Sequence, residues 1–157
     1  GNEFIDMSIM GIGTNILGYG DDEVDDAVRS VVNNGNMSTL NCPEEVYLAE
    51  RLIDLHPWAD MVRLARSGGE ANAIAIRIAR AASGKDKVAI CGYHGWHDWY
   101  IGITSRSGGI PEGIKNLSFT FPFNDIESIK NALDETVDCV ILEPFIFEKR
   151  IQVSTKV

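Results

Sequence analysis

The stretch SGGEANAIAIRIARAA, from Ser67 to Ala82, lies between two short apolar runs, residues 61–65 and 88–91. The continuous apolar character of residues 88–91 is typical of a strand buried in a parallel sheet. Residues 71–82 are apolar on most faces, which predicts a buried helix. A strand, a glycine turn, a helix and a second strand in this order indicate an α/β fold with a mostly parallel sheet flanked by helices.

Two further runs, residues 117–121 and 137–142, are also continuously apolar and are predicted to be parallel strands. Between them, Asn124 and Glu127 form an Asn-x-x-Glu capping pattern. This pattern predicts a helix that begins at Asn124 and crosses from one strand to the next.

The N-terminal third has a different organisation. Residues 2–10 alternate loosely in polarity, which predicts a strand or two, and glycines follow. Apolar residues at helical spacing predict a helix over residues 21–32. A second helix is predicted to begin near Asn41 and Pro43 and to end at Pro57.

Composition limits the classes of function. The chain has 157 residues, 45% of them hydrophobic, and a net charge of −9, which disfavours nucleic acid and anionic membranes as partners. No apolar run reaches the ~18 residues of a membrane span. Three widely spaced cysteines, Cys42, Cys91 and Cys139, favour free thiols in a reducing compartment. We therefore expect a soluble, cytoplasmic chain that is part of a longer protein.

Two short motifs are candidates for a ligand site. Ser67, Gly68 and Gly69 stand where a helix begins, so their N–H groups and the helix dipole suit a phosphate. Tyr93 and His94 follow the strand at residues 88–91 and are suited to cover a flat aromatic ring. Each motif alone also fits a structural role, as a tight turn or as an aromatic cluster packed on the sheet. Both follow predicted parallel strands, at the edge where open α/β sheets bind ligands.

Other signatures fit less well. Gly11-Ile12-Gly13 lacks the third glycine and the helix of a dinucleotide-binding turn, and Gly84-Lys85 lacks the rest of a phosphate-loop motif. The spacing of Cys91, His94 and His97 by threes leaves a zinc site open as an alternative, although no fourth ligand is evident.

Several stretches resemble the class III aminotransferases, in particular members similar to glutamate-1-semialdehyde aminomutase. The resemblance is colinear over nearly the whole chain, and it rests on residues 4–7, 17–19, 60–71, 74–80, 84–87, 92–95 and 142–144.

This resemblance implies a fold type I enzyme that binds pyridoxal 5'-phosphate (PLP) in a large domain with a seven-stranded sheet. Residues 1–57 would be the N-terminal segment of the small domain with linker helices, and residues 58–157 the truncated front half of the large domain. The resemblance also implies a homodimer when the chain is full length, an amino donor and a carbonyl acceptor as substrates, and no metal.

The resemblance also assigns roles to residues. Ser67, Gly68 and Gly69 would bind the cofactor phosphate, and Tyr93 would stack on the ring with His94 alongside. Glu143 would be the catalytic carboxylate close to the ring and the substrate. Ser38 and Asn41 would lie near the substrate entrance.

Two departures qualify this expectation. Gly69 stands where many members have threonine, so a hydroxyl that reaches the phosphate is missing. The family's Schiff-base lysine and the aspartate that pairs with the pyridine nitrogen would lie beyond Val157, and neither Lys149 nor Lys156 matches the lysine. We therefore expect an aminotransferase fragment that is inactive alone. A non-catalytic PLP-binding remnant or interaction module, and an aminomutase or racemase, are the alternatives.

Overall fold

A computed structural model of the chain describes residues 1–37 and 39–144. It contains two compact units, Gly1–Val62 and Arg63–Val157, and each is described by itself. The assignment of residues 1–57 to a small domain and of residues 58–157 to a large domain stays a prediction.

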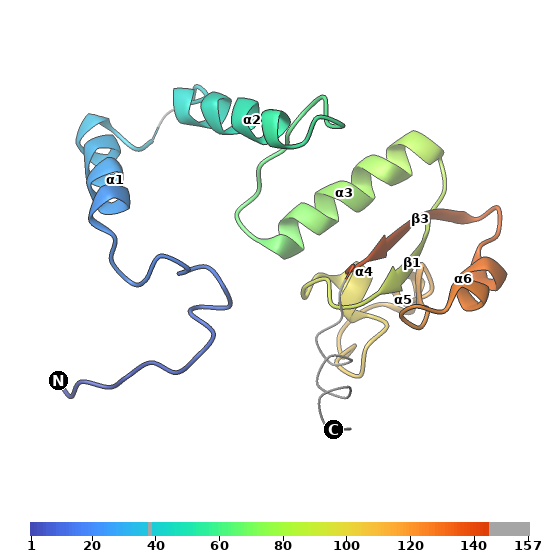
Figure 1. The fold of residues 1–157 in the computed structure, drawn as a ribbon. Coiled ribbons are helices and arrows are strands. Elements are labelled where there is room, and N and C mark those ends of the chain that lie inside the picture. The colour runs from blue at the N-terminus through green and yellow to red at the C-terminus, as the bar shows by residue number, and fades with distance from the viewer. Residues whose placement is uncertain (38, 145–157) are drawn as a thin grey trace. The chain divides into compact units, whose positions relative to one another are not determined.

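The first unit contains the two predicted helices (Figure 1). Helix α1 spans Asp22–Asn34, and the Asp21 carboxylate accepts a hydrogen bond from the N–H of Val24 at 3.0 Å. Helix α2 spans Pro43–Leu55 and has its proline in the first turn, where the missing N–H costs nothing. Both helix predictions are confirmed.

The strand predicted within residues 2–10 is wrong. Residues 1–20 form turns and irregular backbone, and Phe4, Ile5 and Met7 are 86–89% exposed. A strand needs a neighbour to pair its backbone groups, and none lies beside this segment among the described residues. Loose alternation of polarity therefore did not suffice to predict a strand here.

The second unit is built around a parallel sheet in the order β2-β1-β3. Its elements are α3 (Gly68–Ser83), β1 (Lys87–Cys91), α4 (Asp98–Ile101), α5 (Glu112–Lys115), β2 (Ser118–Thr120), α6 (Ile126–Ala132) and β3 (Val137–Leu142). Figure 1 shows α3 lying along the sheet. The predicted α/β class and its three downstream parallel strands are confirmed.

The core lies between the central strand and the helices on one face of the sheet. Val88 and Ile90 of β1 are fully buried and cluster with Ile76 of α3 and with Trp99 and Tyr100 of α4. Side chains alternate between the two faces of a strand, so Val88 and Ile90, which are two positions apart, both face α3. This packing fixes the start of α3 beside the end of β1.

Three details of this unit differ from expectation. Residues 61–65 form no strand, because no strand pairs with them in the part of the chain that the structure describes. Helix α3 is not buried all round, since Gly69 and Ile76 are its buried residues and Ile78 is 59% exposed. Helix α6 is capped by Asp125, and not by Asn124 as expected. The Asp125 carboxylate accepts from the N–H of Ser128 at 2.9 Å, and Asn124 is the preceding residue, with a positive φ of 59°.

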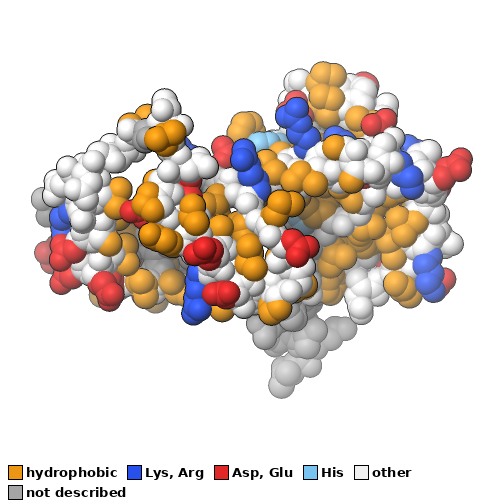
Figure 2. Space-filling model, turned by 90° about the horizontal axis from the view of Figure 1, so that it is seen from above, with side chains coloured by type: hydrophobic (Ala, Val, Ile, Leu, Met, Phe, Trp, Pro, Cys, Tyr) orange, Lys and Arg blue, Asp and Glu red, His pale blue; other side chains and the backbone are white. Residues whose placement is uncertain are grey.

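Many large apolar side chains are at the surface. The space-filling view shows them among the charged residues (Figure 2). Val140 and Leu142 of β3 are 40% and 50% exposed, so one face of this edge strand is only partly covered by the described residues. No described helix is long and apolar enough to cross a membrane.

Candidate cofactor site

The candidate site forms where β1 and β3 end. The strands are parallel, so Gly92 after β1 and Glu143 after β3 leave the sheet at the same edge. The N–H of Glu143 donates to the carbonyl of Cys91 at 3.2 Å, which extends the pairing by one step. The loop of residues 92–97 then runs from this edge to α4.

Helix α3 presents open donors at its first turn. The hydroxyl of Ser67 caps the helix by accepting from the N–H of Glu70 at 3.3 Å, and the Glu70 carboxylate accepts from the N–H of Arg66 at 2.8 Å. The N–H groups of Gly68 and Gly69 have no hydrogen-bond acceptor among the described residues. They remain available to an anion at the positive end of the helix.

The first turn of α3 and the loop after β1 are in close contact. A Cβ added to Gly95 would lie 3.0 Å from the Cα of Gly69, and Gly95 has a φ of +103°. The side-chain amide of Asn72 also donates to the carbonyl of His94 at 3.2 Å. Gly95 is therefore required both by its backbone conformation and by the close approach of the helix.

Glu143 is bound to the base of the same loop. Its Oε2 accepts from the N–H of Tyr93 at 3.3 Å. Gly92 has a φ of +98°, and a Cβ there would lie 2.7 Å from Oε2 of Glu143. The glycine thus lets the carboxylate approach the backbone and fixes where Tyr93 leaves the strand.

Tyr93 and His94 occupy different environments. The Tyr93 ring is 66% exposed and contacts Tyr100 edge to face, with the ring centroids 5.7 Å apart. The His94 ring is only 5% exposed, and its Nε2 lies 2.9 Å from the carbonyl of Cys91. Tyr93 therefore presents an open aromatic face, whereas His94 holds the loop to the strand.

Tyr100 contacts the rings of both Tyr93 and His94. Its ring also contacts His94 edge to face at 5.7 Å, and burial raises the pKa of its hydroxyl, with a further contribution from Tyr93. Tyr100 is therefore a neutral, buried support for the Tyr93 ring at physiological pH.

For the other predicted site residues, Ser38 and Asn41, the place near the substrate entrance stays a prediction. Asn41 precedes α2 in the first unit, and Ser38, Lys149 and Lys156 lie outside the described residues. The possible zinc site is not supported, because within residues 1–37 and 39–144 no three His, Cys, Asp or Glu side chains come together to hold a metal ion.

The sequence analysis gave no role to Gly95 or Tyr100, and it considered His97 only as a possible zinc ligand. Gly95 and His97 stand within three positions of the aromatic motif, so the spacing of the motif was a usable signal. The contact of Tyr100 with Tyr93 depends on the turn into α4, for which the sequence pattern gave no sign.

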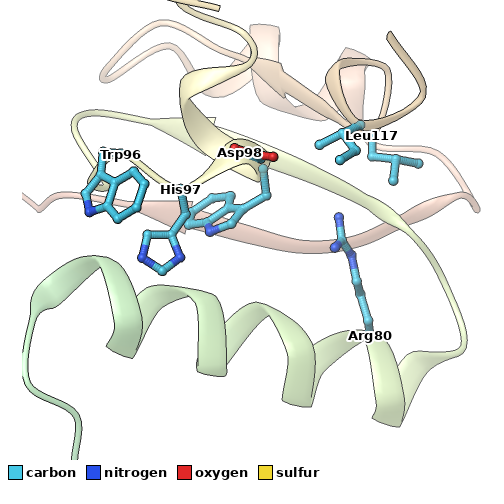
Figure 3. A pocket seen from close by; sticks show the side chains of 7 residues that line it. Arg80, Trp96, His97, Asp98 and Leu117 are labelled. Atoms are coloured by element: carbon cyan, nitrogen blue, oxygen red, sulfur yellow. The ribbon is translucent and has the colours of Figure 1, made fainter. Parts of the chain in front are cut away.

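A cavity of about 440 Å³ lies next to the loop, and Figure 3 shows the residues that line it. Trp96 and His97 extend from the loop towards α3, and Arg80 extends towards the cavity from the other end of that helix (Figure 3). The cavity therefore adjoins the first turn of α3 through the loop residues that pack on it.

The solved structures that this fold resembles define its class. An omega-transaminase from Sphaerobacter thermophilus superposes with a TM-score of 0.79 at 24% identity, over 94% of this chain and 41% of that one. A transaminase with PLP bound gives 0.79 at 28% identity, over 88% of this chain and 36% of that one. The second unit has the fold of the fold type I PLP transferases, of which it contains a part.

Sequence comparison gives the family. The model for class III aminotransferases matches residues 1–149, and the chain belongs to this family. A 3-aminobutyryl-CoA aminotransferase of Cloacimonas acidaminovorans is 40% identical over 88% of this chain and 33% of its own length. A glutamate-1-semialdehyde 2,1-aminomutase of Methanocaldococcus jannaschii is 37% identical over 92% of this chain and 37% of its own length. The chain spans about a third of the length of these curated relatives and corresponds to their N-terminal portion.

Proposed function

We propose that the chain forms the phosphate-binding turn and the ring-facing loop of a PLP-dependent aminotransferase. The observation that carries this proposal is the pair of open N–H groups at Gly68 and Gly69, packed against the loop that presents Tyr93. A Cβ at Gly95 would lie only 3.0 Å from the Cα of Gly69, so the loop and the helix start form one closely fitted cradle. The residues present fit a phosphorylated aromatic cofactor.

Each residue has a distinct role in this proposal. The N–H groups of Gly68 and Gly69 bind the phosphate. Ser67 caps the helix through the N–H of Glu70, so it leaves these two N–H groups free. The exposed face of Tyr93 stacks on the pyridine ring, and Tyr100 fixes the angle of the Tyr93 ring. These contacts orient the cofactor relative to the sheet edge.

Glu143 and His94 act on the same loop. Glu143 positions the backbone of Tyr93 by accepting a hydrogen bond from its N–H. The same carboxylate lies at the sheet edge, where the pyridine ring of the cofactor would bind. His94 holds the loop to Cys91, and its direct contact with the cofactor stays a prediction. When bound, PLP supplies an electron sink for the transfer of an amino group between an amino donor and a carbonyl acceptor.

We propose further that these 157 residues do not catalyse transamination by themselves. None of the four lysines among the described residues is placed at the cradle. Lys87 begins β1 at the opposite end, and Lys115 and Lys130 pair with Glu112 and Glu127. Lys85 precedes β1 near the same far end. In this proposal, the lysine and the aspartate that the resemblance implies come from the part of the full-length enzyme beyond Val157.

An aminomutase is the second candidate, because several relatives at 33–37% identity are glutamate-1-semialdehyde aminomutases. Both reactions use the same cradle. Assays of the full-length enzyme with separate amino donors and acceptors, and with a single amino-aldehyde substrate, distinguish them.

Replacement of Gly68 tests the proposal most sharply. Gly68 is the first residue of α3 and Ser67 before it is extended, with φ −140° and ψ 158°, so proline fits this position while removing its N–H. In the full-length enzyme, we expect Gly68→Pro to weaken PLP binding roughly 10- to 100-fold, the effect of one lost hydrogen bond to a charged group. Gly68→Ala retains the N–H and serves as the matched control.

Affinities for PLP and for pyridoxal, which lacks the phosphate, are measured by absorbance titration. We expect Gly68→Pro to leave pyridoxal binding unchanged. Absence of saturable PLP binding by the wild-type enzyme, or equal affinity of the proline and alanine variants, contradicts the proposal.

A further inference from the structure

His97 occupies the space that a side chain at position 69 would need. A Cβ added to Gly69 would lie 3.2 Å from Cδ2 and 3.3 Å from Nε2 of His97. Gly69 has an ordinary helical backbone within α3, so its conformation alone does not require glycine. The constraint on a side chain at position 69 comes instead from the imidazole ring, which covers the second residue of the helix and would have to shift to admit a Cβ.

The direction of the His97 ring is determined by its backbone. His97 caps α4, and its carbonyl accepts from the N–H groups of Tyr100 and Ile101, both at 2.9 Å. Trp96 contacts the imidazole edge on, with the ring centroids 5.0 Å apart. Figure 3 shows the His97 side chain directed from the loop towards the N-terminal turns of α3.

The ring nitrogens of His97 are nonetheless not engaged. In the described part of the chain, neither nitrogen has a hydrogen-bond partner, in contrast to Nε2 of His94. A half-buried imidazole held in place with an unused N–H is positioned to donate to a ligand. The nearest open donors, at Gly68 and Gly69, point to an anion as that ligand.

We propose that Nε2 of His97 donates a hydrogen bond to the phosphate of PLP, together with the N–H groups of Gly68 and Gly69. This inference rests on the proposed function. The family resemblance implies a threonine hydroxyl at position 69 in many members, and in this proposal the imidazole takes that place from the neighbouring loop. Gly69 and His97 therefore form a matched pair, in which the small residue admits the ring that replaces the hydroxyl.

Four variants of the full-length enzyme test this pair. His97→Leu fills much of the space but has no donor, whereas the amide nitrogen of His97→Gln reaches a similar position to Nε2. The double variant Gly69→Thr/His97→Ala restores a hydroxyl after clearing the space for it. His56→Ala is the control for loss of a histidine, because His56 is the C-cap residue of α2 and belongs to the other unit.

Dissociation constants for PLP and pyridoxal, and the concentration of inorganic phosphate that displaces PLP, are the measurements. We expect His97→Leu to lose roughly 10- to 100-fold in PLP affinity with pyridoxal affinity unchanged. His97→Gln and the double variant recover most of the loss, and His56→Ala has no effect.

The outcomes separate this inference from the proposed function. If the wild-type enzyme does not bind PLP, the proposed function fails, and this inference fails with it. If the wild-type enzyme binds PLP but His97→Leu binds it equally well, only the role of His97 is contradicted. Equal losses for PLP and pyridoxal would show that His97 packs against the loop without contacting the phosphate, which also overturns the inference.

Discussion

At the scale of single residues, glycines determine which side chains meet at the candidate site. Gly92, Gly95 and Gly69 each stand where a Cβ would come within 3.2 Å of another part of the cradle. Two of them also have a positive φ, which other residues adopt only at a cost. Substitutions at these positions therefore test the geometry of the cradle directly.

Gly92→Ala is the clearest case. The new Cβ would lie 2.7 Å from Oε2 of Glu143, in addition to the strain of a φ of +98°. We expect the full-length protein to lose about 2 kcal/mol or more of unfolding free energy. Gly35→Ala, with a φ of +103° and no atom within 4 Å of the added Cβ, is the matched control and measures the strain alone. Equal losses in chemical denaturation would contradict the close contact with Glu143.

Cys139 gives a second residue-scale prediction. Burial raises the pKa of its thiol to about 11, with a further contribution from Asp138. At pH 8 only about one thiol in a thousand is then the reactive thiolate. We expect Cys139 to resist iodoacetamide in the native protein and to react after denaturation, as measured by peptide mass spectrometry.

The same shift predicts the sign of a pH effect. The unfolded protein ionises this thiol at a lower pH than the folded protein does, so unfolding releases a proton. Between pH 9 and about 11, the contribution of Cys139 therefore lowers stability as pH rises. Rapid alkylation of native Cys139 at pH 8 would contradict the raised pKa of the thiol, on which this pH effect depends.

At the scale of elements, the strength of local signals determined what the sequence could predict. The helices at residues 22–34, 43–55 and 68–83 carry caps, prolines or glycines at their ends, and they were predictable. The three buried parallel strands were predictable from continuous apolar runs. The strands expected at residues 2–10 and 61–65 were not found, because pairing depends on neighbours that the local pattern does not contain.

Helix α6 tests how capping is assigned. The sequence pattern favours Asn124, but the Asp125 carboxylate accepts from the N–H of Ser128. We expect Asp125→Ala to cost about 1 kcal/mol of unfolding free energy. Asn124→Gly should cost nothing or stabilise slightly, because Asn124 has a φ of 59° that glycine adopts more easily. A larger loss at Asn124 than at Asp125 in urea denaturation would contradict the observed cap.

At the scale of the whole molecule, the chain belongs to the class III aminotransferase family and spans about a third of the length of its curated relatives. The candidate site was predictable in part, because Ser67 and Gly69 carry the glycine signal of a helix start, and Tyr93 and Glu143 follow the apolar runs of β1 and β3. The buried position of His94 was not, since it depends on how the loop folds back on Cys91.

We also expect the full-length enzyme to be a homodimer, as the family resemblance implies. Apolar side chains that are largely exposed here, such as Phe4, Ile5 and Met7, are costly to leave in water in such number. Light scattering coupled to size-exclusion chromatography measures the mass, and a monomer at micromolar concentration would contradict this proposal.

The central claim is that the first turn of α3 binds the phosphate of PLP. The most direct test is a crystal structure of the full-length enzyme loaded with PLP. We expect phosphate oxygens at hydrogen-bond distance, about 2.7–3.2 Å, from the backbone nitrogens of Gly68 and Gly69, with the pyridine ring against Tyr93. A phosphate bound away from this turn, or a ring that does not contact Tyr93, would contradict the claim.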